Sequence, residues 1–235
     1  MTTRNRGKEA NDDLLFGSTM AKTALNEAVQ DVSYLLGRGY SNKSSVSIAG
    51  ARYKLNARQQ KALRGIAASS QEVGLRQSKV LPPSQLAKKH IDIDGFNLLI
   101  LLETAYSGGY LFKGMDGAYR DLSSVHGSYK RVTRTMEVLK AVGDYLKALK
   151  VGEVRWYFDT PVSNSGRLKT ILYELAEEQG YNWQVELVYN PDKVLASSEN
   201  VIISSDAFIL NECKQWFNIV EYLRKDSWTV FEIEQ

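Results

Sequence analysis

The sequence contains a single cysteine, Cys213, and no long apolar run. One cysteine excludes an internal disulfide and a zinc site made of several cysteines. The longest apolar stretch, near Leu98–Leu102, is far too short to span a bilayer. The segment Met1–Arg6 has neither an apolar core nor a small-residue cleavage site, so we expect no signal peptide. These absences predict a cytoplasmic protein that does not enter a membrane.

Charge is distributed unevenly along the 235 residues. An apolar content of 43% and a charged content of 24% are typical of a folded protein with one large or two unequal domains. Residues 1–90 contain 15 Lys and Arg against 6 Asp and Glu (+9), whereas residues 91–235 contain 15 against 21 (−6). This division suggests that one half holds a polyanion on which the other half acts. Alternatively, the basic residues only keep the first half soluble.

The first part of the chain shows helical patterns. Apolar residues recur at helical spacing from Asp13 to Arg38, a short helix is expected after Ser41, and another after the N-cap Asn56. The last two are compatible with a helix-turn-helix that presents basic side chains: Arg52, Lys54, Arg58, Lys61 and Arg64. We therefore predict a small basic all-α domain over residues 1–68. Residues 69–87 are rich in Ser, Gln and Lys, which indicates a linker.

Residues 88–235 alternate between strand and helix patterns. Four apolar segments each end on an aspartate: Ile91–Asp94, Val154–Asp159, Val185–Asp192 and Val201–Asp206. Helical segments between several of them, including a long one over Ser128–Leu149 and one over Gly166–Gln179 capped by Ser165, predict a central, mainly parallel sheet in an α/β fold. A glycine-rich stretch, Tyr106–Lys130, contains a hairpin pattern around Asp116-Gly117.

The four strand-ending aspartates suggest a metal site. The carboxyl ends of parallel strands open on one edge of a sheet, where ligands bind. Four carboxylates at that edge repel one another unless cations hold them together, and Mg²⁺ or Mn²⁺ prefers such oxygen ligands. We therefore expect the metal ligands and catalytic residues to be Asp94, Asp159, Asp192 and Asp206. The alternative is that any one of them only caps a helix or turn, above all Asp206, which directly precedes a helix pattern.

Short motifs around these aspartates resemble those of the PIN/NYN ribonuclease superfamily. Ile93-Asp94-Gly95-Phe96-Asn97 is similar to its first-strand motif, and Tyr157-Phe158-Asp159 to its mid-sheet acidic strand end. Asp192 and Ile203-Ser204-Ser205-Asp206 resemble its later acidic positions. The resemblance covers roughly residues 88–225 and implies a three-layer, metal-dependent nuclease domain over residues 88–235. The family's further acidic residue on an early helix has three candidates here: Glu103, Asp116 and Asp121.

The whole chain also resembles an uncharacterised prokaryotic family of unknown function that joins a small helical domain to a PIN-like domain. The residues that carry this likeness are Arg38-Gly39-Tyr40, Gly50–Leu55, Arg58-Gln59 and Pro161–Gly166.

Several polar side chains are candidates for binding a substrate. Asn97 follows Asp94 by three residues, where its amide either orients a ligand or satisfies turn backbone. Ser165 and Arg167 open a helix beyond Asp159, where free N–H groups, a hydroxyl and a guanidinium would suit a phosphate. Lys130 and Arg134 lie one turn apart on a predicted helix and either contact nucleic acid or form a solvated face.

These observations leave three functional hypotheses. The first is a metal-dependent endoribonuclease, with RNA preferred to DNA only through the NYN resemblance. The second is a phosphatase, because Asp92 and Asp94 are spaced like the two aspartates of haloacid-dehalogenase-type enzymes. The third is a non-catalytic regulator that binds nucleic acid. A homo-oligomer is compatible with each.

Overall fold

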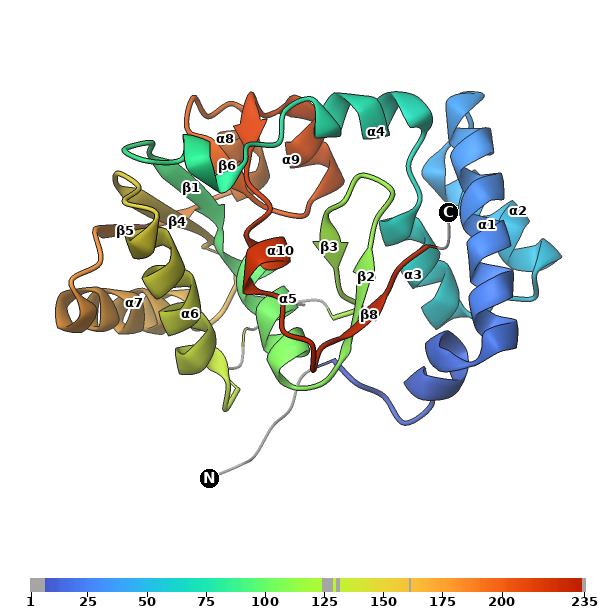
Figure 1. The fold of residues 1–235 in the computed structure, drawn as a ribbon, viewed down its shortest axis with the longest axis horizontal. Helices are drawn as coiled ribbons and strands as arrows, with labels where there is room; N and C mark the ends of the chain where they lie inside the picture. The colour runs from blue at the N-terminus through green and yellow to red at the C-terminus, as the bar shows by residue number, and fades with distance from the viewer. Residues whose placement is uncertain (1–6, 124–128, 130–131, 161, 234–235) are drawn as a thin grey trace.

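The computed structural model describes residues 7–123, 129, 132–160 and 162–233. A helical N-terminal region precedes a mostly parallel five-stranded sheet with helices on both faces, as shown in Figure 1. The α/β fold class predicted from the sequence is therefore confirmed. Within the described residues, no helix is long and apolar enough to cross a membrane.

Local capping determines where the N-terminal helices begin. Helices α1 to α4 follow a short π-helical turn, η1. The residue before each of the four helices has a side chain that accepts a hydrogen bond from a backbone N–H of the first turn: Ser18, Ser41, Asn56 and Ser69. Asn56 and Ser69 form full capping boxes with Gln59 and Glu72. The elements span η1 Asp13–Gly17, α1 Thr19–Gly37, α2 Asn42–Arg52, α3 Ala57–Ile66, α4 Ser70–Gln77 and the 3₁₀ turn η2 Pro83–Gln85.

The five-stranded sheet has the order β5-β4-β1-β6-β7, and every neighbouring pair is parallel. Its strands are β1 Ile91–Asp94, β4 Val154–Asp159, β5 Trp183–Val188, β6 Val201–Ile203 and β7 Gln215–Trp216. The central strand is β1, in which Ile91 lies opposite Val154 on one side and Val201 on the other. This register brings the carboxyl ends of β1, β4 and β6 to the same edge.

Alternating side chains on the strands pack against helices on opposite faces of the sheet. Trp156 and Phe158 of β4 lie in the larger core with α5, α6 and α7, whereas Tyr157 lies in a smaller core with α8 and α9. These helices, with the short α10, span α5 Gly95–Tyr106, α6 Thr135–Ala148, α7 Ser165–Gln179, α8 Pro191–Ala196, α9 Ala207–Glu212 and α10 Ile219–Leu223. Helices on both faces give three layers.

A second sheet joins the two parts of the molecule. It has the order β3-β2-β8, with β2 Tyr110–Lys113, β3 Tyr119–Arg120 and β8 Thr229–Phe231. Phe112 and Phe231 of this sheet share a core with apolar residues of the N-terminal helices. The distance between the ring centroids of Phe16 and Phe112 is 4.8 Å. Figure 1 shows β2 and β8 lying between these helices and the rest of the molecule. The basic helices therefore pack directly on C-terminal strands.

Some predicted elements differ from those observed. Residues 70–77, which composition suggested as part of a linker, form α4. Ser165 is not an N-cap but the buried first residue of α7; Asn164, in a left-handed conformation, precedes it. Asp192 does not end a strand, because β5 stops at Val188 and Asp192 lies in the first turn of α8. The predicted hairpin is confirmed, since β2 pairs antiparallel with β3 and Gly117 supplies the positive φ (+85°) of the turn.

A buried ion-pair network links α4 to this hairpin. Asp116 in the turn accepts hydrogen bonds from Arg76 of α4 (2.8 Å) and Arg120 of β3 (2.6 and 2.9 Å). Arg76 also contacts Glu72 and Asn211. Burial alone would raise the pKa of Asp116, but the two guanidinium groups keep that pKa below its usual value.

We expect Asp116→Asn to lower the free energy of unfolding by about 3–5 kcal/mol, because two guanidinium groups would lose a buried partner. Urea denaturation measures this change. The matched control is Glu137→Gln, which removes an exposed partner of Arg134 and should cost less than about 1 kcal/mol. Similar losses from the two variants would contradict a structural role for the buried network.

Candidate functional site

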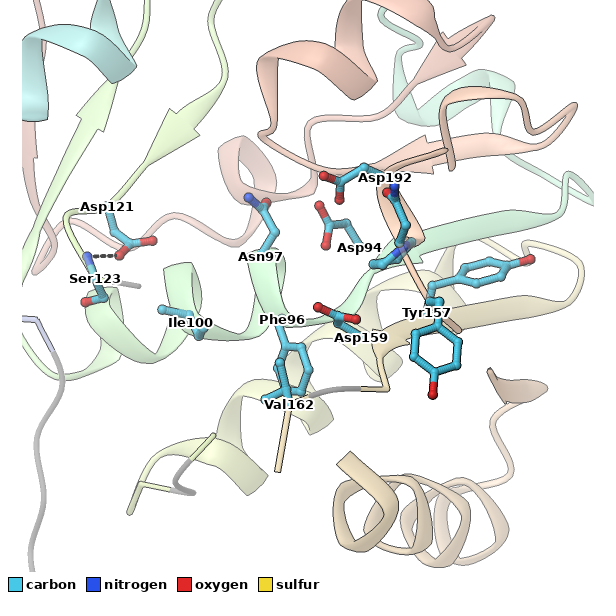
Figure 2. A pocket seen from close by; sticks show the side chains of 13 residues that line it. Asp94, Phe96, Asn97, Ile100, Asp121, Ser123, Tyr157, Asp159, Val162 and Asp192 are labelled. Carbon is cyan, nitrogen blue, oxygen red and sulfur yellow. Dashed lines mark hydrogen bonds between the residues drawn. The ribbon is translucent and has the colours of Figure 1, made fainter. Parts of the chain in front are cut away.

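A cavity of about 650 Å³ opens at the carboxyl edge of the five-stranded sheet. Three of the four predicted aspartates line it: Asp94, Asp159 and Asp192. Figure 2 shows their carboxylates directed toward a common space, with Asp121 set apart beside Ser123. The three aspartates come from the end of β1, the end of β4 and the first turn of α8. Positions nearly a hundred residues apart in the sequence therefore contribute to one acidic cavity.

Asp94 is the most buried of these carboxyl groups, with 7% of its surface exposed. Ser204, in the loop after β6, donates a 2.8 Å hydrogen bond to its Oδ2. Burial, followed by the negative charges of Asp192 and Asp206, raises the pKa of Asp94 to about 7. The next residue, Gly95, has no room for a side chain, because a Cβ there would lie 2.3 Å from the Phe158 ring.

Asp192 is placed by the turn that starts α8. Asn190 adopts a left-handed conformation and its side chain accepts a hydrogen bond from the Lys193 N–H, so Pro191 and Asp192 form the first turn of the helix. Burial raises the pKa of Asp192, and the charges of Asp206 and Asp159 raise it further. The neighbouring carboxylates therefore make it harder for Asp94 and Asp192 to ionise, which a bound cation would reverse.

Asp206 has a different role from the other three. Its Oδ1 accepts hydrogen bonds from the Phe208 and Ile209 N–H groups, so it caps α9. It lines a neighbouring cavity rather than the acidic one. The predicted helix cap is therefore present at Asp206, and its role as a metal ligand stays a prediction; its charge raises the pKa values of Asp94 and Asp192.

The donor chemistry of the acidic cavity fits a hard divalent cation. No three His, Cys, Asp or Glu side chains in the part of the chain that the structure describes form a ready-made metal cage. Mg²⁺, however, is commonly held by one or two carboxylates and keeps several waters. The cavity therefore fits a partly hydrated Mg²⁺ or Mn²⁺, held by some of Asp94, Asp159 and Asp192, better than an ion surrounded by protein ligands.

Asn97 lies on the first turns of α5 and lines both the acidic cavity and its neighbour. Its Oδ1 accepts a 2.9 Å hydrogen bond from the Ser205 N–H, which connects α5 to the loop after β6. This oxygen thus satisfies a backbone group, but one in the loop after β6 and not in the turn after Asp94 as the alternative had it. This hydrogen bond fixes the orientation of the Asn97 amide. Its nitrogen can then donate a hydrogen bond to a bound molecule.

Of the three candidates for a further acidic ligand, only Asp121 lines the acidic cavity. Glu103 is fully buried on α5, where it accepts hydrogen bonds from the Tyr129 and Thr135 hydroxyls. Asp116 lies in the ion-pair network described above. Glu103 and Asp116 therefore stabilise the fold instead of reaching the cavity.

The predicted phosphate-binding side chains do not line the acidic cavity where the structure describes them. Ser165 is buried, Arg167 is exposed in the first turn of α7, and Arg134 pairs with Glu137 at 2.8 Å. Lys130 lies outside the described residues. The loop before α7 reaches the cavity through Val162 instead.

Sequence analysis missed a second cavity, of about 620 Å³, which adjoins the first. Both cavities are lined by Asn97, Asp121 and Ser123. Basic side chains line the second one: Lys43, Lys61, Arg64 and Arg120. The positive charge of residues 1–90 was the available signal, but the sequence did not indicate which face of the helices would meet the sheet edge.

Comparison with known proteins places the chain in a family. Residues 83–222 match the family described as "Domain of unknown function (DUF5616)", and the chain belongs to it. Residues 24–79 match "Protein of unknown function (DUF434)". A relative from Methanocaldococcus jannaschii, "Uncharacterized protein MJ0935", is 28% identical over 207 residues, which cover 86% of this chain and 99% of that protein. No solved structure matches. These matches bear out the predicted likeness to an uncharacterised prokaryotic family, and the PIN/NYN resemblance stays a hypothesis.

The raised pKa of Asp94 predicts a pH-dependent stability. In the folded protein this carboxyl holds its proton up to about pH 7, whereas in the unfolded chain it loses it near the usual 3.8. Without divalent cations, the free energy of unfolding should therefore fall as pH rises between these values. We expect Asp94→Asn to stabilise the protein at pH 8, by on the order of 4 kcal/mol, and far less at pH 4.

Urea denaturation in chelator at the two pH values measures this difference. Asp226→Asn, at an exposed position away from both cavities, is the control and should have little effect at either pH. An Asp94→Asn effect of equal size at both pH values would contradict the raised pKa.

Proposed function

We propose that the protein is a metal-dependent nuclease, and most specifically an endoribonuclease that hydrolyses internal phosphodiester bonds. The observation that carries this proposal is the grouping of Asp94, Asp159 and Asp192 in one cavity. Burial raises the pKa values of Asp94 and Asp192, and the charges of neighbouring carboxylates, including Asp206, raise them further. A cavity that disfavours its own negative charge is suited to hold a cation with the anionic substrate beside it.

In this proposal the three aspartates hold Mg²⁺ or Mn²⁺. The bound ion would supply a water of lowered pKa and would stabilise negative charge on a phosphoryl oxygen. Ser204 fixes the rotamer of Asp94 through its hydrogen bond to Oδ2. The Nδ2 group of Asn97 can donate a hydrogen bond to a phosphate oxygen at the boundary of the two cavities.

The motif resemblance to PIN/NYN ribonucleases supports the same reaction. The motif residues that line the acidic cavity are Asp94, Phe96, Asn97, Tyr157, Asp159 and Asp192. The preference for RNA over DNA rests on the resemblance alone. The proposed location is the cytoplasm, with which the single cysteine, a buried free thiol, is compatible.

The position of Asp92 disfavours the phosphatase alternative. A nucleophile must reach the substrate, but Asp92 is buried and does not line the acidic cavity. Its Oδ2 accepts hydrogen bonds from Ser198 (2.6 Å) and Asn200 (3.2 Å), which join β1 to the segment before β6. These contacts indicate a structural role for Asp92.

The decisive experiment is incubation of the purified protein with circular single-stranded RNA, in Mn²⁺, in Mg²⁺ and in chelator. Circular RNA has no end for an exonuclease, so only an endonuclease can open it. We expect the circle to be opened only when a divalent ion is present. The single variants Asp94→Asn, Asp159→Asn and Asp192→Asn should each lower the rate at least about 100-fold, as expected for groups that hold the ion.

Asp226→Asn is the matched control, since it removes one exposed carboxylate outside both cavities and should keep the full rate. Cleavage that survives all three cavity substitutions would reject this site. No cleavage with either ion, together with RNA binding in chelator, would reject hydrolysis and favour the non-catalytic regulator.

A further inference from the structure

The second cavity forms a basic groove between the N-terminal helices and the carboxyl edge of the sheet. We define the basic groove as the cavity of about 620 Å³ lined by Lys43 of α2, Lys61 and Arg64 of α3, and Arg120 of β3. Three of these four cations come from the helices that precede the sheet domain. The groove thus places three of the 15 Lys and Arg residues of the first 90 positions beside the acidic cavity.

The basic groove and the acidic cavity are continuous along three shared residues: Asn97, Asp121 and Ser123. Asn97 is anchored at this junction because its Oδ1 accepts the Ser205 N–H at 2.9 Å. A molecule that occupied both cavities would therefore pass the amide of Asn97. Its anionic part in the groove would lie directly beside the three carboxylates.

The four cations differ in how much of their charge is available. Arg120 is held by Asp116 and by the Ser205 carbonyl, and Lys61 donates a 2.8 Å hydrogen bond to the Leu122 carbonyl. Lys43 and Arg64 are exposed and form no ion pair with the residues that the structure describes. Within the described part of the chain, these two side chains of the groove are therefore available to bind an external anion.

Two carboxylates also line the basic groove. Asp121 lies at the junction with the acidic cavity, and Asp206 is engaged in capping α9. Four cations against two carboxylates leave the groove with an excess of positive charge. The sign of charge thus changes from positive to negative along the two joined cavities, which fits a ligand with several successive phosphates better than a single small anion.

An exposed aromatic ring suggests which form of nucleic acid fits. Tyr189 lines the acidic cavity, yet 78% of its surface is exposed. An exposed ring beside a phosphate-binding path suits stacking with an unpaired base, as in proteins that bind single strands.

We propose that the basic groove binds the sugar–phosphate backbone of a single-stranded RNA whose next nucleotide enters the acidic cavity. The N-terminal helices would then contribute directly to substrate binding, through Lys43 and Arg64. This inference rests on the proposed function for RNA as the ligand and for the direction of the strand toward the carboxylates. The binding itself needs no hydrolysis, so the two proposals can fail separately.

The test measures binding of a short fluorescent single-stranded RNA by anisotropy, in chelator and at several salt concentrations. We expect Lys43→Gln/Arg64→Gln to raise the Kd at least about tenfold at low salt, since two phosphate contacts are lost. The slope of log K against log salt should become shallower by about 1.4, at roughly 0.7 for each contact with a single strand. The charge-preserving variant Lys43→Arg/Arg64→Lys should keep the binding.

The matched control is Lys22→Gln/Lys140→Gln. It removes two exposed helical lysines that line neither cavity, and so changes the net charge equally. A similar loss of binding in the control and groove variants would overturn the groove, as would unchanged binding in both. Tighter binding of the same sequence as a duplex would overturn the single-strand assignment.

Cleavage of circular RNA in Mn²⁺, measured with the same variants, separates the two proposals. Groove-dependent binding without any cleavage supports the groove and rejects the nuclease. Cleavage with equal rates and equal Kd values in the groove and control variants supports the nuclease and rejects the groove. Near-ultraviolet circular dichroism of each variant shows that the comparison is made between folded proteins.

Discussion

Repulsion among carboxylates is the constraint on which the arrangement of the sheet edge depends. The parallel register of β1 with β4 and β6 brings Asp94 and Asp159 to the same edge, and α8 adds Asp192. The hydrogen bonds that Asp94 accepts from the Ser204 hydroxyl and from the Asn97 backbone N–H lower its pKa, but burial and the neighbouring negative charges raise it by more. No basic side chain neutralises Asp94 within the described hydrogen bonds and ion pairs, so the raised pKa remains.

Local signals predicted much of the fold. Asn56 and Ser41 marked the starts of α3 and α2 because a capping side chain acts within one turn. The β-branched and aromatic residues of Ile91–Asp94 and Val154–Asp159 identified two central strands, because these residue types are enriched in strands. Asp94 and Asp159 lie at one cavity because parallel strands share a carboxyl edge, whereas Asp192 reaches the cavity from the first turn of α8 and not from the end of a strand as the sequence predicted.

These local signals did not predict the contacts between residues far apart in the sequence. The sequence did not indicate that Asp116 would pair with Arg76, forty residues earlier, or that Glu103 would be buried beside Tyr129. The sequence also suggested a linker over residues 69–87, a segment that contains α4. A short amphipathic helix and a polar linker have similar composition, so composition alone did not distinguish them. The face of α2 and α3 that carries Lys43 and Arg64 toward the sheet depends on packing against β2 and β8, which no local pattern encodes.

The shared core of the helices and the β3-β2-β8 sheet means that the two family matches in this chain do not correspond to two separable pieces. Cutting the chain near residue 80 would uncover Phe112 and Phe231 on one fragment and Phe16 on the other. It would also remove Arg76 from Asp116. Insertions or deletions that disturb this shared core would lower the stability of both segments. The DUF434 and DUF5616 segments are therefore expected to be inherited together wherever the β3-β2-β8 sheet is retained.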